Sequence, residues 1–326
     1  MALIGKKHVL DGIKLTRNTD VFHKLYVDQK KNVRFPEEIN VQLDAEDYVK
    51  MNDNERALFH RLVAYFMPTE LLVQNVLGES FYPYIMHPRA KMAMTVQMFM
   101  EDIHSDFFEM ILNSFNMNHD ELYNIAATDP IIKQKHEMVA HSADMISISH
   151  GGIDADSIEG KRAILMAILI NNIVQEWTRF YSGFALFFAM RETGKMRNVC
   201  NGMDLVLIDE SFHLQLGIEL ILGIIDETPW ILDDEDFVTK VKQALVDGTE
   251  LELRFLHSLL QENSIFQVNY EEMSQYLKFV TDRRLEELGF DAYYGVPKNP
   301  LRFLEKQDLM TLQNFFEVTP NQYTNF

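Results

Sequence analysis

Apolar residues recur along most of the chain three or four positions apart, and the long alternating patterns typical of strands are missing. This periodicity predicts long helices over residues 53–81, 88–115, 119–127, 130–146, 157–194, 203–226, 233–261 and 269–288. Helices of this length without coiled-coil heptads are typical of a large bundle whose core lies between them. We therefore expect an all-α protein.

The expected helix ends coincide with residues that favour them. Pro88 opens one helix, Ser157 is placed to cap another, and Gly194 closes a third. Pro68 lies inside the first long pattern, where we expect it to kink or split the helix. There is no internal repeat and no Gly/Ser/Pro-rich linker, so we expect one domain over residues 1–300. Residues 301–326 lose the periodicity and are expected to form an extended C-terminal tail.

Composition and charge narrow the class of protein. A hydrophobic content of 47% describes an ordinary globular chain. A formal charge of −19 argues against nucleic acid or an anionic membrane as the main partner, because both would repel it. The single cysteine, Cys200, excludes an internal disulfide and fits a reducing cytosol. No signal peptide or apolar run of about twenty residues is present, so we expect a cytoplasmic protein without a membrane span.

Two helical segments carry a glutamate and a histidine three residues apart on an apolar side. Glu101 and His104 lie in QMFMEDIHSDFFEMIL, and Glu210 and His213 lie in LIDESFHLQLGIEL. Positions three apart share a helix face, where a charged group must be paired, hydrogen-bonded or bound to metal. Composition alone gives about one accidental Glu three residues before a His, so a single pair could be a satisfied core histidine. Two pairs together indicate ligands.

Two further helices each place one carboxylate among apolar residues. These are Glu70 in AYFMPTELLVQNVL and Glu176 in ILINNIVQEWTRFYSGFALFF. Each by itself could be an ordinary partly buried acid, and Arg179 offers Glu176 an ion-pair partner. Added to the two pairs, they complete the ligand set of a ferritin-like bundle with a dinuclear metal site. Oxygen and imidazole donors without thiolate suit iron or manganese and argue against structural zinc.

With these motifs, the chain resembles the small, radical-generating subunit of class I ribonucleotide reductase. The resemblance extends over most of the chain, through VRFPEEINV, TELLVQNVL, EDIHSDFF, EWTRFYSGFA, LIDESFHLQLGIELI and VTDRRLEELGF. It implies that Asp209 orients a metal-bound His104. It also implies a homodimer that partners a large catalytic subunit and starts the reduction of ribonucleotides to deoxyribonucleotides for DNA replication. The implied metal ligands are Glu70, Glu101, His104, Glu176, Glu210 and His213.

Four positions depart from the family pattern. Phe108 stands where most members have the radical-bearing tyrosine, so the resemblance narrows to a tyrosine-free subgroup in which a manganese/iron cluster itself stores the oxidising equivalent. Two irons or two manganese ions are also compatible with the ligand types. Arg34 occupies the place of the relay tryptophan, and Ile208 replaces a basic residue. Tyr323, the expected relay tyrosine of the tail, is followed by only three residues.

Three functions compete on this evidence. The leading prediction is the radical-initiating subunit of a ribonucleotide reductase. A stand-alone dinuclear oxidase or oxygenase acting on a small organic substrate is the alternative, and it would account for the absent relay tryptophan. A ferritin-like metal store is disfavoured, because NFFEVTPNQYTNF resembles a partner-docking tail that such a store does not need.

Overall fold

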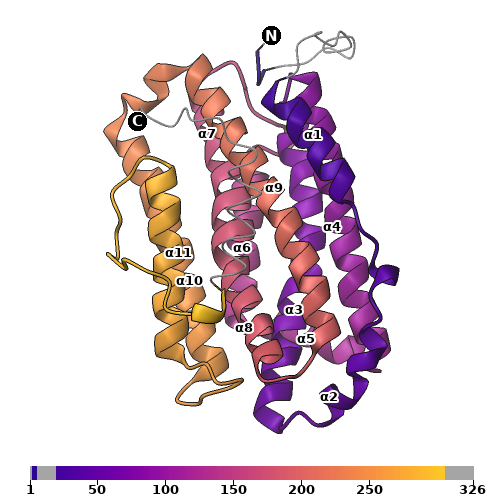
Figure 1. Ribbon diagram of the computed structural model, residues 1–326. Coiled ribbons are helices and arrows are strands. Elements are labelled where there is room, and N and C mark those ends of the chain that lie inside the picture. Colours follow the sequence, from indigo (N-terminus) through magenta and orange to yellow (C-terminus); the bar gives the residue numbers. More distant parts are fainter. Residues whose placement is uncertain (1, 6–19, 305–326) are drawn as a thin grey trace.

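The computed structural model describes residues 2–5 and 20–304, which contain no β-strand beyond isolated bridges. Long helices run side by side (Figure 1). None of them is both long and apolar enough to cross a membrane. The α-helices are α1 (Val21–Asn32), α2 (Ala45–Val49), α3 (Asp53–Val76), α4 (Pro88–Ser114), α5 (His119–Thr128), α6 (Pro130–Asp144), α7 (Ile158–Ile168), α8 (Phe180–Glu192), α9 (Arg197–Glu227), α10 (Glu235–Leu260) and α11 (Tyr270–Glu287).

The remaining helical elements are short or unusually wound. Two of them are π-helical continuations of longer helices: η3 follows α3, and η5 joins α7 to α8. The others are 3-10 turns in the connections. Their bounds are η1 (Pro36–Glu38), η2 (Val41–Asp44), η3 (Leu77–Phe81), η4 (Ile148–His150), η5 (Leu169–Arg179), η6 (Pro229–Leu232) and η7 (Arg302–Leu304).

The all-α prediction is confirmed, and most predicted helices match within a few residues. The periodicity missed α1, a short polar helix that buries only Phe22, Leu25 and Gln29. Asp20 caps its N-terminus, because the Asp20 carboxylate accepts a hydrogen bond from the His23 N–H at 2.8 Å. Few buried apolar positions leave a weak periodic signal, so such a helix is stabilised by its packing against the bundle rather than by its own pattern.

Of the kink or split expected at Pro68, the split does not occur. Helix α3 continues through this residue for its full 24 residues. Proline cannot donate the N–H that would bond to the carbonyl four residues earlier. Tertiary packing offsets that loss, because α3 lies against α4, α5 and α6 and buries most of its second half. The helix therefore carries Glu70 into the centre of the bundle in unbroken register.

The single helix predicted over residues 157–194 has a different winding in its middle. Leu169–Arg179 forms the π-helix η5 between α7 and α8, and ten of its eleven residues are buried. Its wider turns are seen at Thr178, whose hydroxyl donates to the carbonyl of Ile173 five residues back. π-Helical turns inside α-helices are frequent at functional sites. Here the π-helix carries Glu176.

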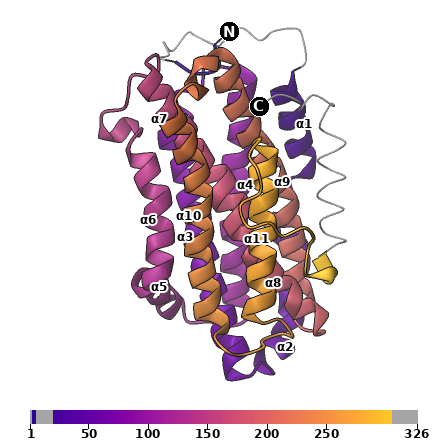
Figure 2. The ribbon, with the colours of Figure 1, turned by 90° about the vertical axis from the view of Figure 1, so that its left-hand side faces the viewer.

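The π-helix η5 contacts α9, α10 and α11. Helix α3 packs on α4. Figure 2 shows α5 and α6 at one edge of the bundle and α1 at the other. Close approach of α9 to η5 depends on Gly217, because a Cβ there would lie 2.5 Å from the Asn172 Cβ. Gly183 of α8 similarly lies against the ring of Phe66, which a Cβ at residue 183 would overlap. Small residues thus bring the central helices together.

A fully buried charge cluster lies where α6, α10 and η5 meet. The Lys135 Nζ is 2.5 Å from one Glu252 oxygen, and the Arg179 Nε is 3.8 Å from the same oxygen. The Ser182 hydroxyl donates to the other Glu252 oxygen at 2.5 Å. Burial lowers the pKa of Lys135 to about 7, although Glu252 opposes this shift. Glu252 is thus the counter-charge on which both buried cations depend.

Replacing Glu252 with glutamine leaves Lys135 and Arg179 without a counter-charge in the interior. We expect this variant to lose about 3 kcal/mol or more of unfolding free energy, measured by urea denaturation at pH 7. Glu46→Gln is the matched control, because Glu46 pairs with Lys50 at 3.1 Å while both side chains are mostly exposed. That surface pair should contribute less than about 1 kcal/mol. Equal losses in both variants would contradict the prediction.

Candidate metal centre

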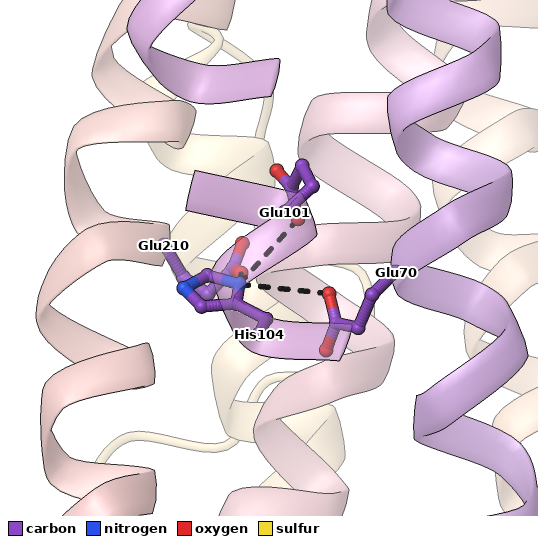
Figure 3. A group of neighbouring side chains, drawn as sticks. All are labelled: Glu70, Glu101, His104 and Glu210. Atoms are coloured by element: carbon purple, nitrogen blue, oxygen red, sulfur yellow. Dashed lines mark ion pairs between the residues drawn. The ribbon is translucent and has the colours of Figure 1, made fainter. Parts of the chain in front are cut away.

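Four neighbouring helices bring the predicted ligands to one place in the core. Glu70 comes from α3 and Glu176 from η5, while α4 and α9 each supply one Glu-x-x-His pair. All six side chains are at most 2% exposed. Figure 3 shows Glu70, Glu101, His104 and Glu210 pointing toward one another. The three-residue spacing places both members of each pair on the inner face of its helix.

The first group of ligand atoms surrounds His104. Its Nδ1 lies 3.6 Å from Glu70 Oε2, 3.5 Å from Glu101 Oε2 and 3.4 Å from Glu210 Oε1. One donor atom from each of these four residues falls within 4.8 Å of the others. Such a cluster has the residue types and the size of a site for one metal ion.

The second group surrounds His213. Its Nδ1 lies 3.0 Å from Glu101 Oε1, 3.6 Å from Glu176 Oε2 and 3.4 Å from Glu210 Oε2. Glu101 and Glu210 therefore each turn one oxygen toward His104 and the other toward His213. Carboxylates placed in this way can bridge two ions. The two imidazole centroids are 6.0 Å apart.

The hydrogen bonding of these atoms tests whether metal ions fit. Both oxygens of Glu70, Glu101 and Glu210, and Nδ1 of both histidines, have no hydrogen-bond partner among the described residues. Buried polar atoms without partners are costly and rare unless they bind metal. Four carboxylates also balance two divalent cations in charge. The donor set, which has no thiolate, fits a pair of hard transition-metal ions.

Without metal, the site distributes protons unevenly. Burial raises the pKa values of Glu70 and Glu176 well above the usual range, and neighbouring carboxylates add to the effect. Burial acts the same way on Glu101, but His213 and His104 outweigh it and lower its pKa to about 2. Burial lowers the histidine pKa values, yet the surrounding carboxylates raise both well above normal. Metal ions would displace these protons.

Side chains around the cage hold its ligands in place. The Asp209 Oδ2 lies 3.3 Å from His104 Nε2, on the far side of the ring from the cage. Asn171 donates to Glu176 Oε1 at 2.8 Å, and Gln97 donates to Glu176 Oε2 at 3.2 Å. The sequence identified Asp209 through the family resemblance but missed both amides. Their signal was only a polar residue on a buried helix face, which is too common to be distinctive.

Other predicted residues lie outside the cage. Phe108 is fully buried, one helical turn beyond His104, and its ring is 5.4 Å from that of Phe66. Arg34 is exposed, and its guanidinium donates to the carbonyls of Lys31 and Val33. Tyr323 and the rest of the tail after residue 304 lie outside the described residues.

Cys200 is buried, and its thiol donates to the carbonyl of Phe187. Burial raises the pKa of this thiol to about 12. A thiolate would be required for nucleophilic attack or for metal binding. The group therefore stays protonated, which agrees with a structural role.

A sequence model of the family described as "Ribonucleotide reductase, small chain" matches residues 16–300. The chain belongs to this family. The curated relative "Ribonucleoside-diphosphate reductase subunit beta" of Chlamydia pneumoniae is 26% identical over 304 residues, which cover 91% of this chain and 86% of the relative. The solved structure of the ribonucleotide reductase R2 subunit from Clostridium botulinum is similar with a TM-score of 0.81 at 22% identity, covering 95% of this chain and 99% of that one.

The fold alone does not separate the ribonucleotide reductase small chains from related oxidases. An R2-like ligand-binding oxidase variant with an aerobically reconstituted Mn/Fe cofactor has a TM-score of 0.63 at 17% identity, covering 81% of this chain and 93% of that one. The family match and the curated relatives favour the ribonucleotide reductase small chains. The chain is thus an oxidoreductase, the radical-initiating small subunit of a ribonucleotide reductase. The family uses a dinuclear metal site, and the buried carboxylate and histidine groups fit one.

Metal analysis of the purified protein should find about two transition-metal ions per chain. Glu101→Ala should lose at least one of them, because Glu101 faces both histidines. Adding metal should raise the thermal midpoint of the metal-free protein, since ions that bind only the folded state stabilise it. Asp102→Ala is the matched control, because this neighbouring carboxylate is exposed. Retention of both ions by Glu101→Ala would remove Glu101 from the ligand set.

Proposed function

We propose that Glu70, Glu101, His104, Glu176, Glu210 and His213 hold two metal ions from which this subunit starts ribonucleotide reduction. The observation that carries the proposal is the pair of shared carboxylates: Glu101 and Glu210 each face both histidines with different oxygens. When bound, the metal pair supplies the one-electron oxidising power of the reaction. The residues around it supply position, charge balance and exclusion of water.

The surrounding side chains have distinct roles in this proposal. Asp209 accepts a hydrogen bond from His104 Nε2, which directs Nδ1 toward the cage and makes the imidazole a stronger ligand. Asn171 and Gln97 donate to Glu176 and fix the orientation of its carboxylate. Complete burial of the cage strengthens every electrostatic interaction inside it.

We further propose that the chain belongs to the tyrosine-free subgroup of the family and contains a manganese/iron pair. Phe108 supports the first part, because phenylalanine has no phenolic hydroxyl from which a tyrosyl radical could form. The absence of thiolate from the cage supports iron or manganese, although ligand type alone also permits two irons or two manganese ions. In such a subunit the metal pair itself keeps the oxidising equivalent.

The physiological partners follow from the family. We propose that the chain assembles as a homodimer in the cytoplasm and acts on a large catalytic subunit, which holds the ribonucleotide. Apolar side chains outside the core support the dimer: Phe35 and Phe99 are about half exposed and lie with their rings 6.5 Å apart. The C-terminal tail, residues 301–326, is the proposed docking segment, with Tyr323 as its relay residue.

A stand-alone oxidase remains the second candidate, favoured by one observation. Arg34 is exposed, and its guanidinium donates to the backbone carbonyls of Lys31 and Val33 in its own segment. A guanidinium cannot relay electrons, so the usual route to a partner subunit is interrupted here. Oxygen consumption with a small organic substrate, without turnover alongside the large subunit, would favour the oxidase.

Anomalous diffraction at the iron and manganese edges should locate one ion of each element in the cage. The activated protein should show an oxidised metal centre by electron paramagnetic resonance and no tyrosyl radical signal, because Phe108 cannot form one. Detection of a stable tyrosyl signal, for example from Tyr181, would overturn the tyrosine-free assignment. Two ions of one element would overturn only the manganese/iron assignment.

Deleting residues 318–326 should abolish ribonucleotide reduction with the large subunit while both metal ions stay bound, because the tail is distant in sequence from every ligand. Tyr323→Phe should keep binding but lose turnover, since it retains the ring and removes the phenolic proton needed for reversible oxidation. Tyr293→Phe, at an exposed tyrosine of the described chain, is the control and should remain active. Full turnover by Tyr323→Phe would exclude Tyr323 as the relay.

A further inference from the structure

The buried position of the cage raises the question of how electrons reach it. Its six ligands are at most 2% exposed, so an external reductant cannot touch the metal pair directly. Side chains that can lose and regain an electron would speed electron exchange with such a buried centre. Tryptophan and tyrosine are the protein side chains suited to this, and the chain has two tryptophans. One of them, Trp177, follows the cage residue Glu176 directly in the π-helix η5.

Trp177 lies in an ordered aromatic and cationic environment. Its ring stacks on that of Tyr181, with centroids 5.4 Å apart and planes 6° from parallel. The Arg284 guanidinium of α11 lies 3.8 Å from the indole centroid. Glu287 holds Arg284 in place, with its oxygens 2.6 and 2.5 Å from Arg284 Nη1. These contacts fix one orientation of the indole between the cage helix and α11.

The surroundings of Trp177 favour a brief loss of one electron from the indole over a long-lived oxidised indole. Arg284 stabilises the neutral ring but would repel an indole that had lost an electron. The indole Nε1 is buried and has no hydrogen-bond partner among the described residues, so no acceptor is placed to take its proton. An oxidised Trp177 would gain neither a counter-charge nor deprotonation here. It would be short-lived and return quickly to the neutral state.

The position of Trp177 also connects the core with the surface. Glu176, the residue before Trp177, turns its carboxylate into the cage. The Trp177 indole lies under Arg284 of α11. Trp177 is 4% exposed and Arg284 is 7% exposed, so both are buried except for a narrow edge. Helix α11 contacts η5 and α8 along this side. The indole thus directly follows a cage residue along the chain and has its outer edge near the surface.

We propose that Trp177 is the relay through which single electrons pass between the protein surface beside α11 and the metal pair. The proposal rests on the metal pair proposed above. In each step one electron leaves the indole for the oxidised metal pair, and a one-electron reductant outside the protein returns one electron to the indole. No bond forms or breaks, and no proton moves. Tyr181 and Arg284 position the ring, and Arg284 prevents the oxidised indole from accumulating.

The test compares Trp177→Phe with Trp230→Phe in the full-length, metal-loaded and oxidised protein. Trp230 is a matched control, because it is the other tryptophan and is 59% exposed on η6. Metal content is measured first, and reduction of the metal centre by dithionite is then followed by stopped-flow absorbance. Trp177→Phe should retain both ions, and its metal centre should be reduced at least about tenfold more slowly than that of the wild type. Trp230→Phe should be reduced at the wild-type rate.

Trp177→Tyr provides a second variant with a flat ring under Arg284. It should also be slow, because tyrosine oxidation requires release of a phenolic proton. Reduction within about twofold of the wild-type rate in a metal-loaded Trp177 variant would overturn the relay. Absence of metal from the wild-type protein would instead overturn the proposed metal function. The two failures are therefore distinguishable.

Discussion

The electrostatics of six buried ligand side chains constrain the rest of this structure. Four glutamates and two histidines meet in the core, and most of their polar atoms have no hydrogen-bond partner among the described residues. Such a cluster is unfavourable unless protons or cations balance it. The long helices are necessary to this arrangement, because their own backbone hydrogen bonds are complete and leave the side chains free to act as ligands.

The helices around the cage depart from regular α-helical sequence and winding at the positions that bring the ligands together. Helix α3 continues through Pro68 to deliver Glu70, and η5 is wound as a π-helix where Glu176 enters the cage. Gly217 lets α9 approach the π-helix closely enough for His213 to face Glu176. Each feature has a local cost in hydrogen bonding or side-chain packing. The function of the centre explains why the chain retains all three.

Two buried charge systems lie side by side in the bundle but are balanced differently. Glu252 is the counter-charge for both Lys135 and Arg179 within the protein. The cage has an excess of carboxylate that its two histidines only partly offset, which suits divalent cations. Trp177, under Arg284, belongs to neither system. Its stacked, cation-covered indole would let electrons reach the cage without giving the cage contact with water.

The sequence by itself determined the all-α class and the candidate ligands, because helical periodicity and Glu-x-x-His spacing are local properties of the chain. It could also show that Phe108 and Arg34 lack the redox chemistry expected at their positions. Only the tertiary structure decided that Glu101 and Glu210 each face both histidines, that Asn171 and Gln97 support Glu176, and that Trp177 lies beneath Arg284. These relations join residues on different helices, or depend on a π-helical winding, and helical periodicity carries no information about either.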